Sequence, residues 1–257
     1  KVLEEARRLV KNGYQEIVLT GICTGAYGRD LGEGMDLNRL LLQLKDIPGL
    51  RRLRISSLDP NDFTPELIDT LTGDPVFCSH LHISLQSGHD KILRDMRRQY
   101  TTAYFADLLQ ALRQRRPRIA ITTDIMVGFP GETEEEHRSS LAFVERMALA
   151  GLHVFKYSPR KGTKAYDFPG QVPHPVKEKR SQDFLALDKK LRDAYARSFL
   201  GETLAVLVET DVEGGYWEGH TDNYLKVRFP AAEDLRGQIV PVRLLETAGD
   251  YILGSLV

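Results

Sequence analysis

The residues best suited to bind a ligand follow short apolar runs. Gln86, Ser87 and Gly88 place an amide, a hydroxyl and a glycine directly after residues 81–85. Such polar groups can bind ribose hydroxyls or a carboxylate. The alternative is that they only satisfy neighbouring backbone groups. Residues 128–131 read Gly-Phe-Pro-Gly after another run, and the two glycines permit a tight turn whose backbone a ligand can approach closely.

The turn at residues 128–131 lies between a predicted strand and a predicted helix. Residues 120–127 alternate and are rich in β-branched side chains, as in a strand that is buried on at least one face. Thr133 can cap the helix, with Glu136 at the reciprocal position of a capping box. Backbone amides are therefore expected at the carboxyl end of a strand, where α/β folds bind their ligands. A strand-to-helix turn without a ligand would show the same pattern.

Strand and helix patterns alternate five times along the first part of the chain. The expected strands are residues 16–20, 53–57, 81–85, 120–127 and 152–157. This alternation predicts βα units around a parallel sheet, with all five carboxyl ends at one site. Five units are too few for a closed eight-stranded barrel. The predicted fold is therefore α/β, with a partial, open βα barrel.

The pattern changes after Pro159. A proline-rich connection leads to a long charged helix over residues 176–199, and everything beyond Gly201 alternates as short strands. Five short strands in about sixty residues suit a small barrel. The expected strands are residues 203–209, 216–220, 224–229, 238–245 and 251–256.

Composition sets broad limits on the class of protein. The chain has 257 residues, of which 42% are hydrophobic and 28% charged, and its net charge is -1. These values are ordinary for a globular protein, so any basic surface for nucleic acid must be local. No apolar run reaches the roughly 18 residues that span a bilayer, and no signal peptide is recognisable. Two cysteines make no disulfide framework, which favours the reducing cytoplasm.

Five motifs follow one another in a characteristic order. They are residues 16–21 with Tyr27 and Gly28; residues 54–57 before Pro60; residues 85–88 with Leu93, Met96, Arg97 and Tyr100; residues 124–132; and residues 157–163. A further set near the C-terminus is Gly219, His220, Thr221, Asn223, Tyr224, Val227 and Gly237. The five motifs in this order resemble the radical S-adenosylmethionine methylthiotransferases, and the C-terminal set resembles the TRAM domain of those enzymes. The two resemblances together cover nearly the whole chain.

The resemblance implies a fold and an activity. Residues 1–200 would form a radical SAM partial barrel with a linker helix, and residues 201–257 a small all-β TRAM barrel. Residues 20–28 and 153–155 are most similar to the tRNA branch that inserts a methylthio group at C2 of threonylcarbamoyladenosine, next to the anticodon. The implied cofactors are S-adenosyl-L-methionine and [4Fe-4S] clusters. The implied partners are tRNA and an electron donor such as flavodoxin or ferredoxin, without a membrane.

One departure from the family concerns the cluster ligands. The family's Cys-x3-Cys-x2-Cys motif and its N-terminal domain with three further cysteines are absent. Cys23 and Cys78 cannot replace them, because a cubane cluster needs several thiolates held close together. The chain starts at Lys1 on a helical pattern, so we expect a fragment whose cluster ligands lie upstream and which is inactive alone.

The resemblance also suggests which residues meet the cofactor. Thr20 and Gly21 correspond to backbone that meets the methionine amino group, while residues 127–129, Phe155 and Tyr157 offer apolar platforms for adenine. Aromatic and branched residues on strands are equally typical of a core. The predicted cofactor-binding residues are Thr20, Gly21, Ser57, Gln86, Ser87, Val127, Gly128 and Tyr157.

Cations beside aromatic rings are the candidates for RNA contacts. Cations can hold phosphates, and exposed rings can stack on bases; a solvated loop and the core of a barrel are the alternatives. The predicted RNA-binding residues are Arg160, Lys161, Trp217, Tyr224, Lys226 and Arg228. His82, His153 and His220 lack metal-ligand spacing, so the sequence predicts no metal ligand in this chain.

Two other functions would fit parts of the pattern. A catalytically dead protein could retain the TRAM domain for RNA binding alone. An unrelated partial-barrel enzyme could act on a phosphorylated metabolite. RNA binding with a steep dependence on salt would argue against the second alternative.

Overall fold

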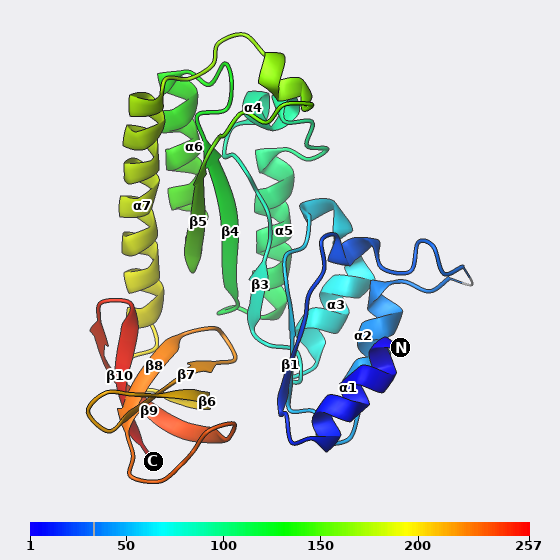
Figure 1. Cartoon of the computed structure of the whole chain (residues 1–257), viewed down its shortest axis with the longest axis vertical. Coiled ribbons are helices and arrows are strands. Elements are labelled where there is room, and N and C mark those ends of the chain that lie inside the picture. Colours follow the sequence, from blue (N-terminus) through cyan, green and yellow to red (C-terminus); the bar gives the residue numbers. More distant parts are fainter. Residues whose placement is uncertain (33) are drawn as a thin grey trace.

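Five parallel strands alternate with helices in the first 156 residues, as the sequence predicts. The computed structural model describes residues 1–32 and 34–257. β1 and β2 pair in parallel, and β3, β4 and β5 form a second parallel set. Parallel bridges from Leu53 to Phe77 and from Leu58 to Ile83 join the two sets. The strands are β1 (Glu16–Leu19), β2 (Arg52–Ile55), β3 (His80–His82), β4 (Ala120–Val127) and β5 (Gly151–Lys156). The predicted open βα barrel is confirmed (Figure 1).

Helices between the strands cover one face of this sheet (Figure 1). Polar side chains cap several of them: those of Thr64 and Thr101 accept hydrogen bonds from helical amides, and Thr133 and Glu136 form the predicted capping box. The helices are α1 (Val2–Lys11), α2 (Leu37–Lys45), α3 (Pro65–Gly73), α4 (Asp90–Asp95), α5 (Thr102–Arg115), α6 (Glu134–Arg146) and α7 (His174–Arg197). Short 3-10 helices span Thr24–Ala26, Pro60–Asp62 and Lys164–Asp167.

The two faces of the sheet differ in chemistry. Along β4, Ile121, Thr123, Ile125 and Val127 are buried, and the three apolar side chains belong to the main hydrophobic core. The alternate side chains point to the opposite face, which we call the lumen face. It carries several polar side chains, and its residues include His82, Ser84, Thr122, Asp124, Met126, His153 and Phe155, of which Ser84 and Thr122 are buried.

The C-terminal strands form a small closed barrel in the order β10-β8-β7-β6-β9. β10 and β8 pair in parallel, and the other neighbouring strands pair antiparallel. The predicted small barrel is therefore confirmed. Its interior holds a separate apolar cluster that includes Val206, Trp217 and Phe229. The strands are β6 (Thr203–Val212), β7 (Tyr216–Thr221), β8 (Lys226–Pro230), β9 (Ile239–Ala248) and β10 (Tyr251–Leu256).

The small barrel packs against the amino ends of β2 and β3. Arg52 donates hydrogen bonds to the carbonyl oxygens of Ala205 (2.6 Å) and His220 (3.2 Å). Arg54 donates to the carbonyl of Asp222 at 3.1 Å. Glu16 pairs with both guanidinium groups, at 3.5 Å and 2.8 Å, and all three side chains are buried. The joint between the two barrels is therefore a charged, hydrogen-bonded contact.

β3 and β8 are among the strands whose limits differ from the prediction. β3 ends at His82 rather than continuing to residue 85, because residues 83 to 86 alternate between backbone bonds to Leu58 and to β4. Tyr224 lies in a turn with φ of 66° and does not start a strand, so β8 begins at Lys226. Within the described residues, no helix is long and apolar enough to cross a membrane.

Candidate cofactor-binding site

A cavity of about 490 Å³ opens at the carboxyl edge of β4 and β5. Volumes of this size are typical of small-molecule sites. The apolar part of its wall includes Met126, Phe129 and Tyr157, while Gln86 adds a polar group. The cavity is lined by Gln86, Asp95, Met96, Arg97, Arg98, Met126, Phe129, Phe155, Lys156, Tyr157, Ser158, Arg160, Thr163, Lys164, Ala165 and Phe168.

Gln86 has an unusual backbone conformation beside this cavity. Its φ is 68°, in the left-handed region that non-glycine residues rarely occupy. The neighbouring strand holds it there, since Gln86 N donates to Asp124 O at 2.8 Å and Met126 N donates to Gln86 O at 2.9 Å. Strain that the surroundings enforce is concentrated at functional sites. Gln86 is therefore a strained residue in the wall of the cavity.

The aromatic wall of the cavity comes from two strand ends and the following loop. The ring of Phe129 meets the rings of Tyr157 and Phe168 edge-on, at 5.3 Å and 6.2 Å between centroids. The hydroxyl of Tyr157 is buried and has no hydrogen-bond partner in the described structure. Burial raises the pKa of Tyr157 above its usual value. This wall can pack against a flat, nucleoside-like ligand.

A buried ion pair fixes the turn that carries Gly128. The amide of Gly128 donates to the Glu132 carboxylate at 2.7 Å, and Arg180 of α7 donates to the same oxygen at 2.7 Å. Burial raises the pKa of Glu132, an effect that these two donors partly offset. Lys177 of α7 also donates to the carbonyl of Tyr157 at 2.9 Å. Helix α7 thereby holds two strand ends of the site, a role that the sequence pattern did not suggest.

The other predicted cofactor residues lie on the same edge but do not line the cavity. Thr20, Gly21 and Ser57 are exposed, and Ser57 Oγ lies 2.8 Å from Ser84 Oγ. Val127 is fully buried in the core, so its side chain offers no surface on which an adenine ring could pack. Ser87 is also buried, and its hydroxyl accepts a hydrogen bond from His89 N, so it stabilises the local turn.

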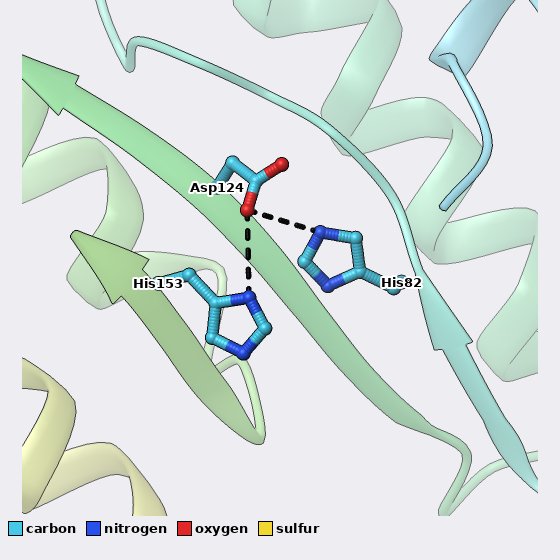
Figure 2. A group of neighbouring side chains, drawn as sticks. All are labelled: His82, Asp124 and His153. Atoms are coloured by element: carbon cyan, nitrogen blue, oxygen red, sulfur yellow. Dashed lines mark ion pairs between the residues drawn. The ribbon is translucent and has the colours of Figure 1, made fainter. Parts of the chain in front are cut away.

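Three strands bring an unpredicted polar cluster together on the lumen face. Asp124 Oδ1 lies 3.2 Å from His82 Nε2 and 3.5 Å from His153 Nδ1, and Figure 2 shows both rings directed at this carboxylate. The two imidazole rings stack at 4.9 Å. Burial raises the pKa of Asp124, but hydrogen bonds from His153 and His82 outweigh it and hold the pKa well below its usual value. Sequence spacing missed this cluster because neighbouring strands, not neighbouring residues, assemble it.

The predicted RNA-binding residues fall into two groups far apart in the fold. Arg160 lines the cavity and Lys161 is exposed beside it. In the small barrel, Lys226 pairs with Asp250 and Arg228 with Glu218, both at 2.7 Å. Trp217 is only 8% exposed and belongs to the barrel core. Tyr224 is half exposed but stacks on His80 and His220, with Arg54 also against its ring.

The cysteines of this chain do not fit an iron–sulfur cluster. Cys23 is exposed near the end of β1, whereas Cys78 is buried just before β3. Burial raises the pKa of Cys78 to about 12, so its thiol is not a ready thiolate ligand. Within the 257 residues, no set of thiolates could hold four irons.

Comparison with known proteins identifies the class. Residues 1–144 match the radical SAM superfamily, and the chain belongs to this superfamily. The fold agrees: coproporphyrinogen III oxidase (HemN) from Escherichia coli, described as a radical SAM enzyme, superposes with a TM-score of 0.53 at 16% identity, over 81% of this chain and 47% of that structure.

Curated relatives give a narrower likeness. The chain is 40% identical over 262 residues to the threonylcarbamoyladenosine tRNA methylthiotransferase MtaB of Bacillus subtilis, covering 100% of this chain and 58% of the relative. It is 35% identical over 258 residues to the tRNA-2-methylthio-N(6)-dimethylallyladenosine synthase of Moorella thermoacetica, with the same two coverages. The chain thus spans a little over half the length of these relatives.

Proposed function

We propose that this chain supplies the cofactor-binding barrel and the RNA-binding barrel of a tRNA methylthiotransferase. The whole enzyme would insert a methylthio group at C2 of threonylcarbamoyladenosine, next to the anticodon. The observation that carries this proposal is the 40% identity to the Bacillus subtilis relative along the entire chain. The cavity at the carboxyl edge supports it, because that edge is where α/β folds bind their ligands.

In this proposal the cavity binds S-adenosyl-L-methionine. Gln86 would hold a polar group of the cofactor, and the edges of Phe129 and Tyr157 would pack against its adenine ring. Bound there, the cofactor supplies radical chemistry that activates a C–H bond. The [4Fe-4S] cluster would be held by cysteines outside these 257 residues, and a flavodoxin or ferredoxin would deliver the electron.

The chemistry of the lumen face favours the threonylcarbamoyl substrate over the dimethylallyl one. His82, Ser84, Asp124 and His153 present hydrogen-bonding groups there. A polar substituent can add hydrogen bonds to such groups, whereas an isoprenoid chain would displace water from them without replacing its hydrogen bonds. A charged or polar substituent on the adenine is therefore the better match.

The RNA would extend from the cavity to the small barrel. Arg160 and Lys161 stand at the cavity, and Lys226 and Arg228 offer cations on β8, although each of the latter also has an acidic partner. Such contacts position a phosphate backbone.

In this proposal the chain divides into two units between residues 200 and 201, and the enzyme acts in the cytoplasm.

A chimera tests the activity. These 257 residues replace the matching segment of the Bacillus subtilis enzyme in a strain that lacks its own copy, and tRNA nucleosides are measured by mass spectrometry. We expect the methylthio form of threonylcarbamoyladenosine to return and the dimethylallyl product to stay unchanged. In the chimera, Gln86→Gly should abolish formation of the methylthio nucleoside, although it relieves the backbone strain at that position. Restoration of the dimethylallyl product alone would contradict the substrate assignment.

A binding experiment tests the RNA contacts separately. The affinity of the 257-residue chain for tRNA is measured across a salt series, for the wild type and for Lys226→Ala with Arg228→Ala. Each phosphate contact that is lost should reduce the slope of log affinity against log salt by about 0.7 to 0.9. Equal slopes for both proteins would show that Lys226 and Arg228 of β8 do not contact RNA phosphates.

A further inference from the structure

The lumen cluster of His82, Asp124 and His153 has the donor set of a transition-metal site. The three side chains come from β3, β4 and β5, and each offers one nitrogen or oxygen atom within 4.8 Å of the others. Asp124 and His153 are direct partners in the parallel register, and His82 is paired with Thr122, two residues before Asp124. The three side chains therefore share one face of the sheet, with His82 two residues nearer the amino ends of the strands than Asp124 and His153 (Figure 2).

The distances within the cluster suit a tetrahedral ion. Zinc binds histidine nitrogen and carboxylate oxygen at about 2.0–2.2 Å, so two ligands at tetrahedral corners lie about 3.3–3.6 Å apart. Asp124 Oδ1 lies 3.2 Å from His82 Nε2 and 3.5 Å from His153 Nδ1. Both separations are close to the tetrahedral edge. The third separation, between the two histidine nitrogens, is no more than 4.8 Å, and rotation of a ring would shorten it.

Outer hydrogen bonds hold two of the three ligands in place. His82 Nδ1 lies 2.9 Å from Thr122 Oγ1, which leaves Nε2 for a metal, and Thr122 Oγ1 in turn lies 3.1 Å from His80 Nε2. Asp124 Oδ2 accepts a hydrogen bond from Ser84 Oγ at 3.2 Å, which leaves Oδ1 free to coordinate. Ligands of bound metals are oriented by partners of this kind.

The third ligand leaves the cluster open on one side. The side chain of His153 is 54% exposed, whereas those of His82 and Asp124 are 12% and 21% exposed. Three protein ligands with an accessible fourth position are the arrangement of catalytic zinc sites. Two nitrogens and one carboxylate are borderline ligands, which suit zinc better than the oxygen-seeking magnesium or calcium ions.

We propose that His82, Asp124 and His153 bind one divalent transition-metal ion of the zinc type, with its open position toward the lumen. The ion would serve as a Lewis acid for an oxygen or nitrogen atom of a ligand in the lumen. This inference stands on the geometry of three side chains and does not depend on which nucleoside the enzyme modifies.

Metal titration of the 257-residue chain tests the site directly. The protein is stripped with a chelator and titrated with Zn²⁺ by calorimetry, and with Co²⁺ by its visible d–d absorption. We expect one equivalent to bind, and the intensity of the Co²⁺ bands to report a four-coordinate ion. His153→Ala and Asp124→Asn should each weaken binding by a factor of about 100 or more, and Thr122→Val by a factor of about 10 to 100.

His220 supplies the matched control. It forms another histidine–carboxylate pair, at 2.6 Å from Glu209 in the small barrel. His220→Ala should leave Zn²⁺ affinity unchanged, and thermal melts should show that the exposed His153→Ala variant stays folded. Absence of binding by the wild type, or binding that survives both His153→Ala and Asp124→Asn, would overturn the proposal and leave a hydrogen-bonded cluster only.

Discussion

The ring of Tyr224, in the turn before β8, stacks on the ring of His80 at the start of β3, with 4.7 Å between centroids. The same tyrosine stacks on His220 at 4.8 Å, and the Arg54 guanidinium lies 4.7 Å from its centroid. Tyr224 therefore joins the two barrels. The sequence predicted Tyr224 as an RNA-binding residue, and the residue is half exposed in the structure.

Replacing Tyr224 should weaken the joint between the barrels. Aromatic pairs and cation–π contacts each contribute roughly 0.5–1.5 kcal/mol, so Tyr224→Ala should lower the free energy of unfolding by about 1–3 kcal/mol. Urea denaturation measures this, with Tyr216→Ala, another partly exposed tyrosine of the small barrel, as control. Unchanged stability together with weaker tRNA binding would mean that the ring serves RNA instead.

Removing the carboxylate of Glu132 should strongly destabilise the protein. Arg180 pairs with Glu132 at 2.7 Å, and both side chains are almost fully buried. Glu132→Gln leaves the buried guanidinium with Glu134, at 3.9 Å, as its acidic partner. Loss of the closer partner of a buried ion pair typically costs about 3–5 kcal/mol. Glu145→Gln is the control, because Glu145 pairs with Lys190 at 2.6 Å on the surface and such pairs contribute at most about 1 kcal/mol. Similar losses in the two variants, measured in urea, would contradict a special role for the buried pair.

Two glycines of one turn should differ in their tolerance of a side chain. Gly128 and Gly131 both have left-handed φ angles, of 72° and 79°. A methyl group on Gly128 would overlap Cγ of Lys177, while one on Gly131 meets nothing within 4 Å. Gly131→Ala should therefore cost only the backbone strain of about 1–2 kcal/mol, and Gly128→Ala distinctly more. Equal urea midpoints for the two variants would show that Lys177 moves aside freely.

The fold was readable from the sequence because each of its signals is local. Alternation in residues 120–127 and the Thr133–Glu136 capping box depend only on near neighbours, and both are present in the structure. The change from βα units to short strands likewise marks the small barrel. Strand limits were less predictable, as at β3, because pairing with two neighbours decides where a ladder ends.

The site was only partly readable because its contacts cross between elements. Gln86 and Tyr157, two of the predicted cofactor-binding residues, line the cavity. The sequence does not show that Arg180 of α7 reaches Glu132 or that Trp217 faces inward. One further signal was present. His82, Asp124 and His153 each stand four residues before a predicted site residue (Gln86, Gly128 and Tyr157). On parallel strands they therefore lie on one face and within two residues of one level.

The two cysteines should react with thiol reagents at very different rates. Cys23 is exposed, so it should react within seconds, whereas Cys78 is buried with its pKa raised by that burial to about 12, against an ordinary value of 9.0. Between those pH values the unfolded chain loses the Cys78 proton first, so this contribution to stability is complete below pH 9 and falls as the pH rises toward 12. Labelling of Cys23→Ser with Ellman's reagent at pH 8, with and without urea, isolates Cys78. We expect negligible labelling of Cys78 in the native protein and full labelling in urea. Rapid labelling of the native protein would show that the pairing between β2 and the residues just before β3 opens readily.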